Sequence, residues 1–228
     1  MSNALLIRRR GMMMAQQGGL PYDAEIEYLE KNGANYIDTG IYGNQPISVK
    51  LRMLSAVSTY YQCVIGCLHT NNPSTNRFAP VIISSTKIVG VTYYSTASSG
   101  GKNVSTAMSN AIPFEVHSSL VPNAQTSMVK LDTEATFTSK TWTDSHNVAA
   151  GYNMYLFAAN NQGTPQSYMN NGGRIYFCQI FSDDSWTTMV RDFIPVRVGT
   201  VGYMYDRISG QLFGNQGTGD FVLGPDIQ

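Results

Sequence analysis

The chain has 228 residues, enough for one large all-β domain or two small domains, and 43% of them are hydrophobic, so it can build a core. Only 13% are charged, which leaves a surface of mostly neutral polar side chains. Fifteen basic residues balance fifteen acidic ones, so no net charge draws the protein to nucleic acid or to a membrane surface.

Residues 1–21 differ from the rest, because their charges are all basic up to residue 20, and we expect an extended anchoring arm. Methionine side chains adapt to irregular grooves, and arginine side chains pair with carboxylates. The residues expected to dock on a partner are Leu5, Leu6, Ile7, Arg8, Arg9, Arg10, Met12, Met13 and Met14. The alternative is a disordered start, with translation beginning at one of the three methionines.

The arm does not resemble an export signal. The apolar run after its arginines is shorter than the stretch of about 7–15 residues that a signal peptide needs. No window approaches the roughly 18 apolar residues of a membrane span, so we expect no membrane insertion.

The segment EIEYLE carries Glu25, Glu27 and Glu30 at spacings that resemble the E-x-D-x-x-E strand of laminarinase-type β-jelly-roll glycosidases. Retaining glycosidases need two carboxyl groups about 5–5.5 Å apart, and Glu25 and Glu27 on one strand face would lie about 7 Å apart. However, Glu27 replaces the central aspartate, and the segment stands at the start of the domain instead of in mid-chain. We therefore interpret it as an opening strand, and the catalytic reading is the less favoured one.

The rest of the chain alternates between short strand-like runs and breakers rich in Gly, Asn, Ser and Pro, such as Ser98-Ser99-Gly100-Gly101. No segment predicts a helix of ten residues or more. About a dozen short strands predict a β-sandwich or barrel. The predicted strands cover residues 36–42, 47–53, 60–66, 81–83, 87–94, 114–120, 126–131, 136–140, 152–158, 174–181, 189–198 and 203–205.

Two of these regions predict more than a strand. Residues 174–181 are nearly apolar on both faces, which is typical of a central strand that is covered on each side. Residues 205–213 predict a hairpin with Gly210 at a left-handed turn position.

The three cysteines, Cys63, Cys67 and Cys178, are expected to be reduced and mostly buried. Four residues of extended strand would hold Cys63 and Cys67 about 13 Å apart, whereas a disulfide needs Cα atoms within about 7 Å. No second ligand pair accompanies the C-x3-C spacing, so we expect no metal site there.

The loop after residue 141 is the most binding-like segment, because an exposed Trp beside Asp and Asn suits a sugar. Its candidate glycan contacts are Trp142, Asp144, His146 and Asn147. The alternative, a Trp142 that packs in the core or on a sheet face, is favoured by composition.

Other polar clusters are expected to be structural. Asp183-Asp184 predicts a turn more than a calcium site. Gly214–Gly219 has the glycines of a phosphate loop but no following helix, so it predicts a turn. His69, His117 and His146 are expected on the surface or in loops.

Two blocks of sequence resemble a known family. They are Glu27–Glu30 with Asn35–Ile41 at the start, and Val190–Arg197, Gly202–Asp206 and Gly217–Phe221 at the end. They are similar to concanavalin A-like (laminin G-like) jelly-roll domains of structural and fibre proteins in tailed phages, including crAss-like gut phages. The resemblance implies an all-β, two-sheet antiparallel jelly-roll sandwich over residues 22–228, preceded by the arm over residues 1–21.

The resemblance also implies a function, namely a non-enzymatic virion component: a head fibre, a capsid decoration or a tail-associated protein. Its expected partners are other virion proteins of the capsid, portal or tail, further copies of itself, and host surface glycans. It would be assembled in the host cytoplasm and would need no cofactor. The alternative is a carbohydrate-binding module or adhesin of a gut bacterium or prophage.

Overall fold

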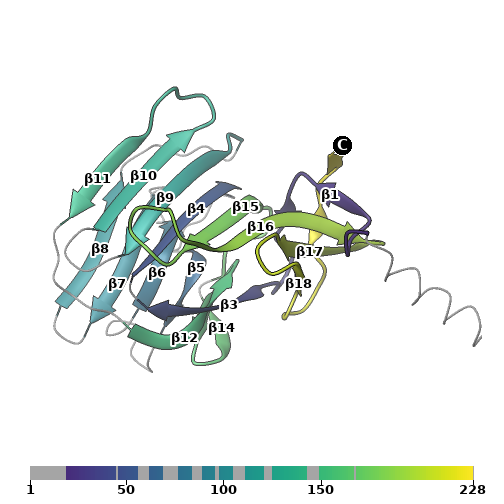
Figure 1. Ribbon diagram of the computed structural model, residues 1–228. Helices are drawn as coiled ribbons and strands as arrows, with labels where there is room; N and C mark the ends of the chain where they lie inside the picture. The colour runs from purple at the N-terminus through teal and green to yellow at the C-terminus, as the bar shows by residue number, and fades with distance from the viewer. Residues whose placement is uncertain are drawn as a thin grey trace, which may run out of the picture.

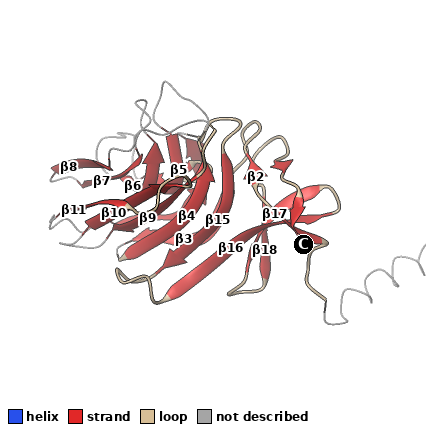
Figure 2. Ribbon diagram, turned by 90° about the horizontal axis from the view of Figure 1, so that it is seen from above, coloured by secondary structure: helices blue, strands red, loops and turns tan. Residues whose placement is uncertain are grey.

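A computed structural model describes residues 19–44, 46–55, 62–68, 77–83, 89–95, 98–104, 111–120, 125–142, 149–166 and 168–227. All regular secondary structure in these ranges is β-strand, and the strands form two facing layers (Figures 1 and 2). No helix long and apolar enough to cross a membrane occurs in the described part of the chain.

The larger sheet contains twelve of the described strands. They are β1 (Ala24–Ile26), β2 (Leu29–Glu30), β4 (Ile47–Leu54), β9 (Phe114–Leu120), β10 (Gln125–Leu131), β11 (Thr138–Trp142), β15 (Arg174–Phe181), β16 (Met189–Val198), β17 (Val201–Asp206), β18 (Gln211–Gly214), β19 (Val222–Leu223) and β20 (Asp226–Ile227).

The smaller sheet contains the other eight. They are β3 (Ile37–Asn44), β5 (Gln62–Leu68), β6 (Arg77–Ile83), β7 (Val89–Ser95), β8 (Ser98–Val104), β12 (Ala149–Leu156), β13 (Ala159–Asn161) and β14 (Thr164–Gln166).

Neighbouring strands in the larger sheet come from distant parts of the chain. Strand β4 lies between β9 and β15. Strand β1 lies between β16 and β20, so the first and last described strands pair with each other. All described pairings are antiparallel except one, because β13 runs parallel to β5. The predicted two-sheet sandwich is therefore confirmed, with that one local departure from a purely antiparallel arrangement.

The core lies between the two sheets and follows from the two-residue repeat of a strand. In β4 the inward side chains of Val49, Leu51 and Met53 are fully buried, while Lys50 and Arg52 face outward and are half-buried. Each fully buried aliphatic side chain contributes about 1.5–3 kcal/mol by leaving water. The alternation in the sequence thus determines which face of the sheet meets the core.

One segment that was expected to separate two strands is itself part of a strand. The residues Ser98-Ser99-Gly100-Gly101 are the first half of β8, which pairs antiparallel with β7 in continuous register. Small residues with weak strand preference are accommodated because the neighbouring strand supplies the ladder of hydrogen bonds.

The special roles predicted for two segments are confirmed. Strand β15 is central, since it pairs with β4 on one side and with β16 on the other. Strands β17 and β18 form the predicted hairpin, in which Gly210 has a φ of 71° in the turn.

The three cysteines are buried, and no disulfide joins them. Cys63 and Cys67 lie on the same strand, β5. Burial raises the pKa of the Cys67 and Cys178 thiols far above their usual range, so both remain protonated and unreactive at neutral pH.

Candidate functional site

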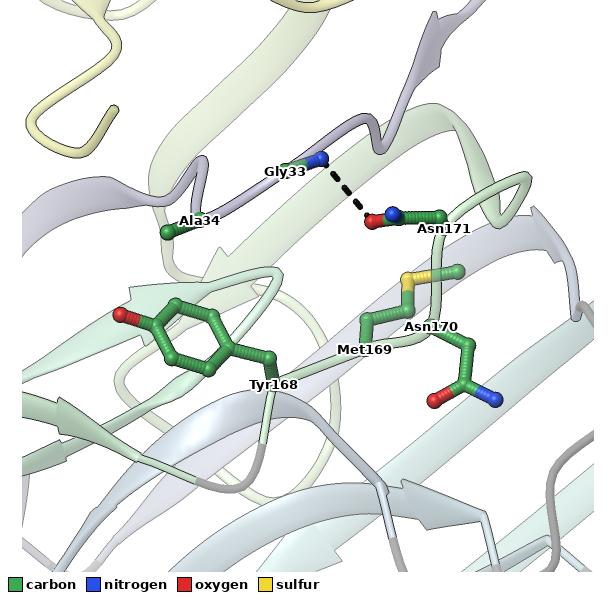
Figure 3. A pocket seen from close by; sticks show the side chains of 6 residues that line it. All are labelled: Gly33, Ala34, Tyr168, Met169, Asn170 and Asn171. Carbon is green, nitrogen blue, oxygen red and sulfur yellow. Dashed lines mark hydrogen bonds between the residues drawn. The ribbon is translucent and has the colours of Figure 1, made fainter. Parts of the chain in front are cut away.

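A pocket of about 480 Å³ opens where two connecting segments meet (Figure 3). The first segment joins β2 to β3 and the second joins β14 to β15. The lining residues are Gly33, Ala34, Tyr168, Met169, Asn170 and Asn171. A pocket of this size matches the lower range of small-ligand sites.

Backbone hydrogen bonds fasten the two segments together. Lys31 N donates to Gly173 O at 2.8 Å, and Gly172 N donates to Lys31 O at the same distance. Gly33 N donates to Asn171 Oδ1 at 2.9 Å, which fixes the plane of that carboxamide (Figure 3). The φ of Gly33 is 101°, a backbone conformation that favours glycine.

The loop over residues 214–219 supports the first segment from behind. Ala34 N donates to Thr218 O at 3.2 Å, and the buried Asn35 side chain donates to Gly219 O at 2.7 Å. The strand β19 follows this loop, and no helix stands there. The predicted turn is confirmed, and Gly217 in it approaches Ala34 so closely that an added Cβ would lie 1.9 Å from the Ala34 carbonyl oxygen.

Tyrosines form the aromatic side of the pocket. Tyr168 lines it, and the rings of Tyr36 and Tyr155 stack nearby at a centroid distance of 4.6 Å. Burial raises the pKa of the Tyr168 hydroxyl, and the charge of Tyr36 adds to the effect. Tyr168 is therefore a neutral, amphipathic ring at physiological pH.

The second segment is hydrogen-bonded to a residue with a strained backbone. Phe157 is fully buried with a φ of 67°, which is rare for a bulky side chain. Its carbonyl accepts a hydrogen bond from Met169 N at 2.8 Å, and its ring packs on Phe221 at 4.8 Å. Such strain persists only where the surroundings hold it, and it is frequent at binding sites.

A buried cation lies behind the pocket wall. Lys31 is only 1% exposed, its Nζ donates to Gly33 O, and the same nitrogen lies 4.8 Å from the centroid of the Tyr168 ring. Burial lowers the pKa of Lys31 to about 8.

The lining suits binding better than acid–base catalysis. It offers carboxamides, backbone groups and a tyrosine ring, which together can hydrogen-bond hydroxyl groups and cover an apolar face. None of its six residues is a carboxylic acid, whereas glycoside hydrolysis uses a pair of carboxyl groups.

The glutamates of EIEYLE occupy separate positions outside this lining. Glu25 accepts a hydrogen bond from Tyr22 at 2.9 Å, and burial together with that bond raises the Tyr22 pKa to about 12. Glu30 accepts from Arg174 Nε at 2.6 Å, and Glu27 is exposed. Glu25 lies on β1 and Glu30 on β2, while Glu27 lies between them, so the segment forms two short strands of the larger sheet where one opening strand was predicted.

The residues predicted to contact ligands lie mostly outside the described part of the chain. This applies to the nine docking residues, Leu5–Met14, and to Asp144, His146 and Asn147. Trp142 is the last residue of β11, and its backbone pairs with Gln125. The glycan contact assigned to this loop stays a prediction.

Asp183, which was predicted to lie in a turn, has a structural role. The Asp183 carboxylate accepts hydrogen bonds from the backbone and hydroxyl of Thr187 and from the backbone of Thr188, so it closes the predicted turn. These bonds hold the pKa of Asp183 well below its usual range. No group of three or more His, Cys, Asp or Glu that could hold a metal occurs among the described residues.

His117 corrects the expectation of a loop histidine. It lies half-buried on β9, bonded to Glu115, with Phe137 at a ring distance of 4.6 Å. Burial lowers its pKa, although Glu115 opposes the effect. His69 lies outside the described residues.

Sequence reasoning did not identify the pocket. No predicted strand or site included Lys31 or residues 168–173. The one usable signal was a tyrosine followed by the run Asn170-Asn171-Gly172-Gly173, since Tyr and Asn are frequent in recognition loops.

No protein-family model matches the chain, and no curated protein matches it. Several solved structures match the chain. A carbohydrate-binding module (CBM40) of the IT-sialidase of Ruminococcus gnavus, bound to α2,3-sialyllactose, has a TM-score of 0.54 and 13% identity, over 71% of this chain and 94% of that one. A Bacteroides ovatus protein described as a carbohydrate-binding protein has a TM-score of 0.57 and 8% identity, over 90% and 61%.

The same fold occurs in animal proteins. The heptameric SAP-like pentraxin of Limulus polyphemus has a TM-score of 0.51 and 11% identity, over 90% of this chain and 96% of that one. Identities this low establish architecture alone. The described chain is therefore a concanavalin A-like jelly-roll sandwich, as the sequence resemblance implied.

Proposed function

We propose that this protein is a non-catalytic carbohydrate-binding domain and that the pocket between residues 31–36 and 168–173 is its sugar site. The observation that carries the proposal is the lining itself: a tyrosine ring beside a carboxamide whose orientation is fixed by Gly33 N. The fold adds support, because two structures that share it are carbohydrate-binding proteins by description. This reading is the alternative weighed in the sequence analysis.

The two sides of the pocket would contact different parts of a sugar. The Tyr168 ring would cover the apolar face of a pyranose, and the amide groups of Asn170 and Asn171 would bond its hydroxyl groups. Because Asn171 is held in place before binding, little conformational entropy is lost when the sugar enters.

The test is a glycan array followed by titration calorimetry with the best binder. Tyr168→Ala should weaken the affinity at least about tenfold, equivalent to about 1.4 kcal/mol, because an aromatic contact is lost. Its melting temperature should change little, since Tyr168 is only partly buried.

The matched control is Tyr42→Ala, which removes a tyrosine that is 58% exposed on β3, away from the pocket lining. It should bind as the wild type does. Equal affinities for wild type and Tyr168→Ala, or an array without a single bound glycan, would reject the proposed site.

Where the domain is displayed is a second proposal. We infer from the sequence resemblance that it is carried on a phage particle, docked through Leu5–Met14. Deleting residues 1–20 should leave the melting temperature nearly unchanged, because the first described strand begins at Ala24. The deletion should abolish co-purification with virions, and truncated protein present on particles at normal copy number would contradict the docking role.

A further inference from the structure

Lys31 is a buried cation without a carboxylate partner in the described structure. It is 1% exposed, and its contacts are the Gly33 carbonyl and the Tyr168 ring. Buried charges in proteins are normally paired, because removing an ammonium group from water costs several kcal/mol. A carbonyl dipole and an aromatic face compensate only part of that cost.

The neighbouring charged groups do not supply the missing anion. Glu30 precedes Lys31 in the chain but pairs with Arg174. The titratable side chain in contact with the ammonium is Tyr168, and burial raises the pKa of its hydroxyl, so it is neutral at physiological pH. Burial alone accounts for the lowered pKa of Lys31, with no contribution from a carboxylate.

The ammonium lies directly behind the pocket. Both of its contacts, Gly33 and Tyr168, are pocket-lining residues, so its positive charge acts across the wall into the cavity. The low dielectric of the surroundings strengthens this field compared with a surface lysine.

We propose that the pocket selects an acidic sugar, with the sugar carboxylate on the Gly33–Tyr168 side, where the positive charge of Lys31 attracts it through the pocket wall. This inference rests on the proposed carbohydrate-binding function and deepens it by naming the substrate class. A neutral sugar would leave the buried cation uncompensated, and an acidic one would neutralise it.

The central experiment compares an oligogalacturonate with its methyl-esterified form, in which each carboxyl group carries a methyl group and has lost its negative charge. Wild-type protein should bind the acid at least about tenfold more tightly at pH 6.5. Lys31→Met, which keeps the length and apolar character of the side chain, should bind both forms within about twofold of each other. Lys140→Met is the matched control, since Lys140 is an exposed lysine on β11, and it should keep the wild-type preference.

Introducing a negative charge into the pocket gives an independent readout. Asn171→Asp retains an acceptor for Gly33 N but adds a negative charge to the lining. It should weaken binding of the acid several-fold and leave the ester nearly unaffected. An unchanged affinity for the acid would count against the assigned location of its carboxylate.

Proton uptake supplies a third readout. Since burial lowers the pKa of Lys31 to about 8, the lysine of the free protein is partly neutral at pH 8.5. A carboxylate ligand favours the ammonium form and raises the pKa, so binding at pH 8.5 should take up a proton, and binding at pH 6.5 should not. Calorimetry in two buffers of different ionisation enthalpy measures the uptake, which should disappear in Lys31→Met.

The outcomes separate the two proposals. Equal binding of acid and ester by the wild type through Tyr168 would reject the acidic-sugar inference and leave the carbohydrate site standing. Equal losses for acid and ester in Lys31→Met would show that Lys31 positions the loop and does not select charge. A protein that binds no sugar at all would reject both.

Discussion

Replacing Asp206 by alanine is expected to lower the free energy of unfolding by about 3–5 kcal/mol, because it removes the acceptor at the centre of a buried polar network. Asp206 is fully buried, and its Oδ1 accepts from Asp192 N at 2.8 Å and from Ile208 N at 3.2 Å. Its Oδ2 accepts from the backbone and the hydroxyl of Ser209, and Arg191 Nε lies 3.7 Å away.

The cost arises from donors that cannot reach water. Asp192 is itself buried, and its backbone N–H would lose its partner in Asp206→Ala. Asp206→Asn should be intermediate, because one amide oxygen remains but the amide nitrogen would face the donors of Ser209.

Urea denaturation followed by circular dichroism measures these differences. The control is Asp220→Ala, which removes an exposed carboxylate near the same end of the chain and should change stability by less than about 0.5 kcal/mol. A loss below about 1 kcal/mol in Asp206→Ala would contradict the role given to this network.

The hairpin that contains Asp206 could be predicted from the sequence. The turn residue Gly210 and the alternation of β17 and β18 are local signals, and they predicted the hairpin correctly. Strand β15 was predicted as central because its apolar pattern records burial on both faces. These features depend on a few neighbouring residues, so the sequence contains them directly.

Short strands that exist only through their partners were missed or misread. β13 and β14 have three residues each, and β8 begins with two serines and two glycines. Their hydrogen-bonding partners lie elsewhere in the chain, and no local preference identifies them.

The pocket was missed for a related reason. Lys31 and Tyr168 are 137 positions apart, and a lysine in a polar segment predicts a solvated side chain. The backbone bonds of Lys31 with Gly172 and Gly173 bring the two segments together. A buried charge is thus a property of the assembled loops, and the sequence alone does not reveal it.

The loop that supports those segments gives the other large expected effect. A Cβ atom added to Gly217 would lie 1.9 Å from the Ala34 carbonyl oxygen and 2.9 Å from its carbon. Both are backbone atoms, so no side chain can rotate to relieve the clash. Gly217→Ala must therefore separate the 214–219 loop from residues 31–36, and we expect a loss of about 3 kcal/mol or more in stability.

Because Ala34 lines the pocket, Gly217→Ala should also weaken sugar binding, in contrast to substitutions that only strain a turn. Gly199→Ala is the matched control: its φ is 60°, and nothing lies within 4 Å of the added Cβ. It should cost about 1 kcal/mol from backbone strain and leave affinity unchanged. Urea unfolding measures the stability of both variants, and calorimetry measures their sugar affinity. Wild-type stability and affinity in Gly217→Ala would mean that the loop does not hold the pocket segment in place.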